Sequence, residues 1–229
     1  MSAQPPAFIP SPPRTGDTIA TATVLALTGG MLDAIVYLTH GHVFANAMTG
    51  NVVLLGVAVL GRDWQQASRH MVPIGAFLCG ILAAKACRSL PERHAISLGL
   101  VFEIVALALA GALPNDFSER IFVGIVAFAA AFQVANFRRV RRFAYNSTFV
   151  TGNLRDLAEG AFDALRPHLS DAARRRGATQ AADLGVVCLS FFAGVLAGGW
   201  LGPHLGNHAL WCTLPLLLIV AILSFRSRR

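Results

Sequence analysis

An acidic residue inside an apolar stretch is the first candidate for chemistry in this sequence. Asp33 lies between Leu32 and Ala34, well inside the first long run of apolar residues. A carboxylate in such surroundings costs several kcal/mol unless it is paired, hydrated or protonated, so it marks a candidate site for a cation or a proton. Glu103 is a second acid of this kind. For both residues the alternative is an interhelical hydrogen bond that only fixes packing.

A Thr-Gly-Asn tripeptide occurs at positions 49–51 and again at 151–153. Thr and Asn are good N-terminal caps of helices, and Gly lets the chain turn sharply or approach a ligand closely. The stretch from Asn51 to Leu60 would make about 15 Å of helix, roughly half of a membrane's hydrocarbon core. Such a half-helix would bring free N–H groups and a positive dipole end near mid-membrane. The alternative is an ordinary cap on a full or interfacial helix.

Together these residues predict a binding site. The predicted substrate-binding residues are Asp33, Asn46, Thr49, Gly50, Asn51, Thr151, Gly152 and Asn153, and the predicted coupling residues are Asp33 and Glu103. After position 153 the sequence becomes amphipathic almost at once, so we expect the second helix to emerge along the cytoplasmic surface. The sequence has no nucleophile with its base, no phosphate-binding loop and no zinc motif, so we predict no catalytic residue, metal or cofactor.

Composition places these residues in a membrane protein. The chain has 229 residues, of which 55% are hydrophobic and only 14% charged, against about 25% charged in a soluble domain. Apolar stretches long enough to cross a bilayer as helices alternate with short charged clusters. These stretches are 18–38, 43–61, 70–90, 95–113, 120–137, 184–202 and 207–225, and a weaker one is 145–165. The pattern predicts an all-α polytopic membrane protein surrounded by a lipid bilayer.

The basic residues indicate the topology. If all eight stretches crossed the membrane, many arginines would fall outside the cell. If 43–61 and 145–165 dip in and return, only Arg62, Arg69 and Arg120 of the nineteen basic residues lie outside. Because basic residues concentrate in cytoplasmic loops, we predict about six transmembrane helices with both termini cytoplasmic. The net charge of +7 is explained in the same way, so we expect no nucleic-acid partner.

Two halves of the chain resemble each other beyond the tripeptides. Residues 77–84 resemble residues 191–198, and His94-Ala95 matches His208-Ala209. Three crossings in each half would make the second half insert upside down, which gives two inverted 3+3 repeats. The predicted organisation is a disordered Pro-rich tail at 1–17, one membrane domain at 18–225 with repeats at about 18–113 and 120–225, and a basic tail at 226–229. A longer cytoplasmic linker containing Arg174–Arg176 would separate matching parts of the second half.

The strings at Gly29–Ala34 and Phe44–Asn51 resemble the signature of the YoaK-like family, a group of bacterial membrane proteins with a domain of unknown function. The stretch from Gln133 to Asn153 resembles the weaker second motif of that family. The sequence departs from the pattern at Gln133–Asn136, where Gln and Asn would be adjacent. The resemblance covers about residues 18–225 and implies a six-helix inner-membrane protein.

These observations predict a multi-pass protein of the bacterial inner membrane that acts as a transporter or channel for a small polar solute. A non-transporting membrane sensor, assembly factor or lipid-interacting scaffold is the alternative. We do not expect an enzyme, because the catalytic groups that one needs are missing. The sequence leaves open which solute is moved and whether the chain forms a homo-oligomer.

Overall fold

The structure is a computed structural model, and it describes residues 18–87, 92–137, 139–140, 143–145 and 150–226. Within these residues the regular elements are helices, apart from two short strands. The elements are α1 (Ile19–Thr39), α2 (Met48–Leu60), α3 (Trp64–Ala86), α4 (Glu92–Gly111), α5 (Glu119–Asn136), β1 (Arg139–Val140), β2 (Phe143–Ala144), α6 (Val150–Leu165), α7 (Asp171–Leu205), the 3-10 helix η2 (Gly206–Thr213) and α8 (Leu214–Arg226). The predicted tail at 1–17 and most of that at 226–229 lie outside the described residues.

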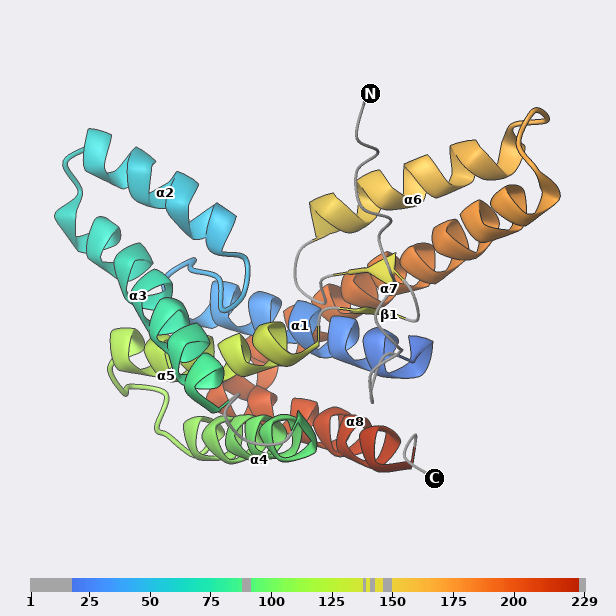
Figure 1. Ribbon diagram of the computed structural model, residues 1–229. Coiled ribbons are helices and arrows are strands. Elements are labelled where there is room, and N and C mark those ends of the chain that lie inside the picture. The colour runs from blue at the N-terminus through green and yellow to red at the C-terminus, as the bar shows by residue number, and fades with distance from the viewer. Residues whose placement is uncertain (1–17, 88–91, 138, 141–142, 146–149, 227–229) are drawn as a thin grey trace.

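Five helical segments of the described chain are long and apolar enough to cross a membrane. They are Ile19–Thr39, Trp64–Ala86, His94–Gly111, Glu119–Asn136 and Asp171–Ser224. The last segment contains α7, η2 and α8, and Figure 1 shows α8 running back from the end of α7. The chain turns at Gly206, whose φ of +56° is in the region that favours glycine. The prediction of a polytopic helical membrane protein is confirmed.

One expectation about the second half is wrong. The stretch around Arg174–Arg176, expected to be a linker, forms the first turns of α7. Ser170 caps this helix by accepting a hydrogen bond from the Ala173 N–H at 3.3 Å. The early turns pack against α6 where Gly160 and Gly177 meet, and a Cβ on either glycine would lie within 3 Å of the other's carbonyl oxygen. A polar sequence therefore stays helical because α6 packs along it.

The centre of the molecule is built from two close helix pairs, α1 with α7 and α3 with α5 (Figure 1). Glycines allow both approaches. A Cβ added at Gly194 would collide with the carbonyl oxygen of Leu27, and one at Gly80 would lie 2.6 Å from the carbonyl oxygen of Phe128. Small residues let helix backbones pack closely in membranes, where van der Waals contact is the main attraction. The helix α1 thereby becomes a buried central element, with Leu25, Leu32 and Ile35 fully inaccessible.

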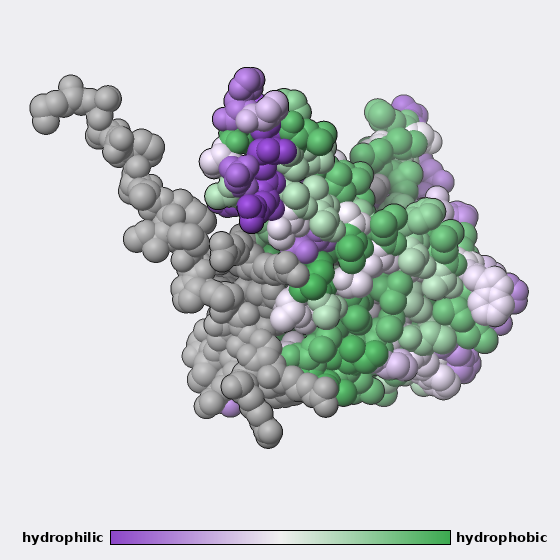
Figure 2. Space-filling view, turned by 90° about the vertical axis from the view of Figure 1, so that its right-hand side faces the viewer, coloured by the Kyte–Doolittle hydropathy of each residue, from purple (hydrophilic) through white to green (hydrophobic). Residues whose placement is uncertain are grey.

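Two hairpins extend from this centre, one formed by α2 and α3 and the other by α6 and α7 (Figure 1). In Figure 1 the N-terminal ends of α2 and α6 point toward the middle of the molecule, and the two helices run outward in opposite directions. Apolar side chains of α2 such as Val52, Val53 and Val57 are exposed. Figure 2 shows a hydrophilic end on the α6–α7 hairpin and hydrophobic side chains over much of the surface below it, as expected for a surface that faces lipid.

Candidate functional site

Asp33 lies on α1 and meets the start of α2. Its side chain is only 4% exposed. Its Oδ1 atom accepts hydrogen bonds from the backbone N–H of Asn46 at 2.7 Å and of Ala47 at 3.4 Å. Ala47 is the N-terminal cap position of α2 and has no side chain that could cap it. The Asp33 carboxyl group of α1 therefore accepts hydrogen bonds from free N–H groups at the N-terminal end of α2. The positive end of a helix dipole is a favourable place for a negative charge.

The segment between α1 and α2 folds back because two successive residues take positive φ values. Gly41 has φ +66° and His42 has φ +57°, so the chain reverses directly after α1. The returning segment is then fixed to α1 by Asn46, whose Nδ2 donates to the carbonyl oxygen of Gly29 at 3.4 Å. Asn46 is 1% exposed. It thus contacts α1 with its side chain and Asp33 with its backbone.

Asn51 holds the same segment from the other side. Its Oδ1 accepts from the Phe44 N–H at 2.9 Å, and its Nδ2 donates to the Phe44 carbonyl oxygen at 2.8 Å. Gly50 gives room for this arrangement, because a Cβ there would lie 2.8 Å from the Phe44 ring. Thr49 is exposed on the surface of α2. Of the first tripeptide, Gly50 and Asn51 therefore shape the Asp33 site, while Thr49 points elsewhere.

A cavity of about 310 Å³ lies against Asp33, between α1, the returning segment and α7. Its walls are Asp33, Ala34, Tyr37, Leu38, Phe44, Ala47, Phe191, Val195 and Gly199. The second carboxyl oxygen, Asp33 Oδ2, is buried and has no hydrogen-bond partner among the described residues. A buried carboxylate oxygen without a partner is unfavourable, so an oxygen left in this state beside a cavity indicates a place for a ligand.

Neither tripeptide lines this cavity, and the second does not lie on an element that does. It lies in the first turn of α6, where Asn153 is buried and Thr151 and Gly152 are exposed. Residues 146–149, which belong to the predicted second motif, lie outside the described residues. Asn153 and Asn51 occupy matching positions in α6 and α2, and both are buried. The helix α6 is amphipathic, as the sequence predicts.

Glu103 is also separate from the cavity. It is fully buried on α4, and neither carboxyl oxygen has a hydrogen-bond partner among the described residues. The matching residue of the second half, Leu217 on α8, is fully buried as well. An acid in this state is unfavourable for stability. The hydrogen bonds of the described residues therefore do not account for an acid at this position.

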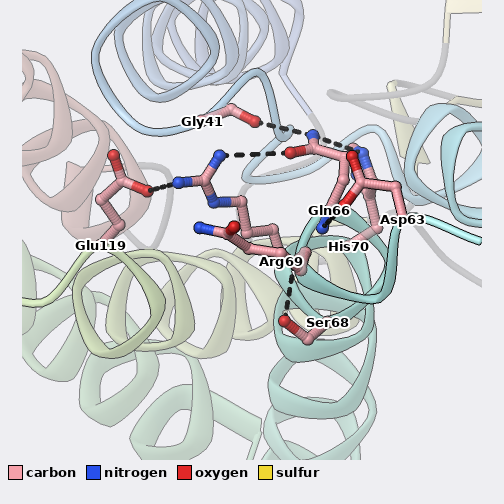
Figure 3. Close-up of polar contacts among 8 residues, drawn as sticks. Gly41, Asp63, Gln66, Ser68, Arg69, His70 and Glu119 are labelled. Carbon is pink, nitrogen blue, oxygen red and sulfur yellow. Dashed lines mark hydrogen bonds and ion pairs between the residues drawn. The ribbon is translucent and has the colours of Figure 1, made fainter. Parts of the chain in front are cut away.

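A polar network at the start of α3 was not predicted from the sequence (Figure 3). Arg69 Nη2 pairs with Glu119 Oε2 at 3.2 Å, and its Nη1 donates to Gln66 Oε1 at 3.2 Å. Gln66 Nε2 donates to the Gly41 carbonyl oxygen at 3.1 Å and lies 3.1 Å from His70 Nε2. These contacts connect α3 and α5 to the turn after α1. The spacing of Gln66 and His70, four residues apart on one helix face, was the available signal.

His70 extends this network to the first tripeptide. Its side chain is 1% exposed, and its Nδ1 lies 3.4 Å from Asn51 Oδ1. Because Gln66 Nε2 is a donor, His70 Nε2 must accept, so His70 Nδ1 carries the proton and donates to Asn51. The Asp33 site is thereby connected, through Asn51 and the returning segment, to the ion pair of Arg69 and Glu119.

His40 is a buried residue of this region, directly after α1. Its ring stacks on Phe122 with centroids 3.8 Å apart. The Thr39 hydroxyl donates to the Ile35 carbonyl oxygen at 2.6 Å, so the His40 Nδ1–H donates to that hydroxyl at 2.7 Å. Burial lowers the pKa of His40 from 6.5 to about 4, although the nearby Glu119 acts in the opposite direction. His40 is therefore neutral at physiological pH.

Comparisons with known proteins agree with the resemblance seen in the sequence. Residues 21–223 match a family described as "Protein of unknown function (DUF1275)". The chain is 29% identical over 145 residues to the "UPF0700 transmembrane protein YoaK" of Bacillus subtilis (strain 168). This match covers 60% of the chain and 64% of the relative, so less than two thirds of the relative's length is matched. No solved structure matches the chain.

Proposed function

The chain belongs to the DUF1275 family, and from this premise and the geometry of the Asp33 site we propose that it is a transporter or channel for a small solute. The observation that carries the proposal is the unpartnered Oδ2 of Asp33 beside a 310 Å³ cavity. Asp33 is six residues before the end of α1, which corresponds to about 9 Å of helix rise. The site would thus lie inside the membrane, where non-helical backbone is tolerated only when it is buried or lines a cavity.

We further propose that the chain consists of two inverted repeats. Helix packing supports this, because three of the main helix contacts have counterparts when the two halves are exchanged. The contact of α1 with α7 corresponds to that of α5 with α3, the α2–α3 hairpin corresponds to α6–α7, and the contact of α4 with α5 corresponds to that of α8 with α1. Gly80 and Gly194, which match in sequence, meet the backbone of α5 and of α1 in the same manner.

In this arrangement α1, α3, α4, α5, α7 and α8 cross the membrane, and α2 and α6 are half-helices that enter from opposite sides. Such interrupted elements bind substrates in secondary transporters whose repeats are inverted. We place both termini in the cytoplasm of a bacterial cell, following the distribution of basic residues. The occupied N–H groups of Asn46 and Ala47 make the Asp33 carboxylate, and not the helix end, the group that meets the solute.

Glu103 is proposed as a second coupling group. Its burial without a partner among the described residues supports a role in which it takes up and releases a proton. Because Glu103 does not line the Asp33 cavity, Glu103→Gln is expected to leave solute binding intact and to alter only the coupling of flux to a proton gradient. Unchanged proton coupling in this variant would remove Glu103 from the mechanism.

Solute-driven currents in reconstituted membranes test the proposal. Purified protein would be placed in proteoliposomes on a solid support, and an organic ammonium ion, potassium, a monocarboxylate and an amino acid would be added one at a time. We expect a current with one of these classes that is lost in Asp33→Asn and kept in Asp116→Asn, a matched change in an exposed acid. Folded protein that gives no current with any class would favour the sensor or scaffold alternative.

A further inference from the structure

The walls of the Asp33 cavity combine one acid with several aromatic rings. Tyr37, Phe44 and Phe191 come from α1, the returning segment and α7, so they approach the cavity from three different elements. Tyr37 and Phe44 stack on each other with ring centroids 4.8 Å apart. The remaining walls are aliphatic apart from the backbone. Aromatic faces carry negative partial charge and attract cations, most strongly when water is excluded.

Asp33 provides a counter-ion for such a cation. Two backbone N–H groups hold one carboxyl oxygen, which offsets part of the cost of burying the charge and fixes the orientation of the group. The other oxygen is buried and unpartnered among the described residues. A positive charge in the cavity would give Asp33 Oδ2 an electrostatic partner.

The lining also restricts the kind of cation. A metal ion such as Ca²⁺ or Mg²⁺ requires six or more oxygen ligands, and of the described side chains around this cavity only the Asp33 carboxyl and the Tyr37 hydroxyl supply oxygen. A primary ammonium group has three N–H donors that all need acceptors. An ammonium ion whose protons are replaced by alkyl groups needs few acceptors or none, and its methyl groups pack on apolar walls.

We propose that the Asp33 cavity binds a small tertiary or quaternary alkylammonium ion, with the charge between Asp33 Oδ2 and the rings of Tyr37, Phe44 and Phe191. This inference rests on the proposed solute site and names the class of solute that it takes. The cavity volume of about 310 Å³ is at the lower end for ligand sites, which suits a compact ion.

Gly199 offers a way to close the cavity without changing its charge. This residue of α7 lines the cavity, and a Cβ built on it would meet only Leu38 Cδ1, at an ordinary contact distance of 3.8 Å. Gly199→Leu is therefore expected to fold and to fill the space that the ion would occupy. Gly75→Leu is a matched control, because nothing lies within 4 Å of a Cβ at that position of α3.

Binding of choline to the purified full-length protein tests the proposal by isothermal titration calorimetry. The neutral analogue 3,3-dimethylbutan-1-ol has the same shape, and 3,3-dimethylbutanoate is a similar anion. We expect choline to bind at least roughly tenfold more tightly than the neutral analogue, and the anion not to bind. Equal binding of choline and the alcohol would overturn the assignment, since the cavity would then be a hydrophobic pocket only. No binding of choline would overturn it as well.

Variants assign binding to the cavity. Asp33→Asn keeps an oxygen that can accept from Asn46 and Ala47, and it should weaken choline binding at least roughly 30-fold. Phe191→Leu keeps the wall apolar and should weaken it roughly threefold to tenfold. Gly199→Leu should abolish binding, and Gly75→Leu and Asp116→Asn should not change it. Parent-like affinity in folded Phe191→Leu and Gly199→Leu would place the choline elsewhere and refute the proposal.

The same measurements separate this inference from the proposed function. Binding of choline without flux in proteoliposomes would leave the alkylammonium site standing and refute transport of that ion. Currents driven by another class of solute, together with no choline binding, would refute the alkylammonium site and leave transport standing.

Discussion

The side-chain amide of Asn51 pairs with both backbone groups of Phe44. The Phe44 N–H donates to Asn51 Oδ1 at 2.9 Å, and Asn51 Nδ2 donates to the Phe44 carbonyl oxygen at 2.8 Å. The Asn51 side chain therefore makes the two hydrogen bonds that a neighbouring β-strand would make with Phe44, which lies in the segment between α1 and α2. This pairing fixes Phe44, a wall of the Asp33 cavity, and the residues directly after it that donate to Asp33.

Removing this pairing should destabilise the protein. Asn51→Ala leaves the Phe44 N–H and carbonyl oxygen without these partners inside the molecule, which should lower the free energy of unfolding by about 2 to 4 kcal/mol. Thr49→Ala, in the exposed residue of the same tripeptide, should have little effect. Thermal unfolding in detergent, followed by tryptophan fluorescence, measures both. Equal melting temperatures for the two variants would contradict the role given to Asn51.

The close helix pairs predict a marked difference among glycines. Gly80→Ala and Gly194→Ala force a methyl group against the backbone of α5 and of α1, so each should destabilise the protein by about 1 to 3 kcal/mol. Gly75→Ala places the methyl group in open space and should stabilise α3 by up to about 1 kcal/mol. Melting temperatures of the three variants test this. A Gly194→Ala variant as stable as the parent would contradict the close approach of α1 and α7.

Topology can be tested by labelling single cysteines in a protein without Cys79, Cys87, Cys188 and Cys212. With α2 as a half-helix, cysteines at the exposed Gln65 and Asp116 should react with a membrane-impermeant maleimide on intact cells. A cysteine at the exposed Arg175 should react only after permeabilisation. If α2 crossed the membrane, position 65 would be protected in intact cells, and the six-helix arrangement would be wrong.

Acid should weaken the structure around His40. Its pKa is about 4 in the folded protein and 6.5 ordinarily, because burial disfavours the charged ring. The unfolded chain then binds more protons between these values, so stability is fully present above pH 6.5 and falls as the pH drops toward 4. His40→Asn should reduce the fall in melting temperature over this interval. Among the described residues, the charged groups that share a pocket with His40 are Arg69, Glu119 and Arg120, and they remain in the variant. Identical pH profiles for parent and variant would contradict this prediction.

Much of the membrane domain could be predicted from the sequence, because helices in a bilayer need long apolar stretches. Stretches such as 18–38 and 120–137 correspond closely to α1 and α5. The prediction that the chain belongs to the YoaK-like family is confirmed over residues 21–223. The proximity of Asp33 to the first tripeptide also follows from local features, since the short segment between α1 and α2 limits their separation.

Only the spacing of Gln66 and His70 signalled the polar network, because its other contacts join distant parts of the chain. Arg69 and Glu119 meet only when α3 and α5 pack together, and hydropathy does not indicate which helices will be neighbours. The apolar character of the cavity was missed for the same reason, since Phe191 and Val195 come from α7. The sequence favours a polar solute because its motifs contain the polar residues near Asp33, whereas the apolar walls from α7 are distant in the chain.

The pairing of α1 with α7 has a consequence for biosynthesis. The helix α1 enters the membrane long before α7 leaves the ribosome. Until then the face of α1 at Gly30 lacks the α7 backbone that it packs against. Asp33 can be held by the segment before α2 from the beginning, but the wall formed by Phe191 arrives only with the second half. A nascent chain that stops before α7 therefore contains Asp33 without the cavity walls that Phe191, Val195 and Gly199 supply.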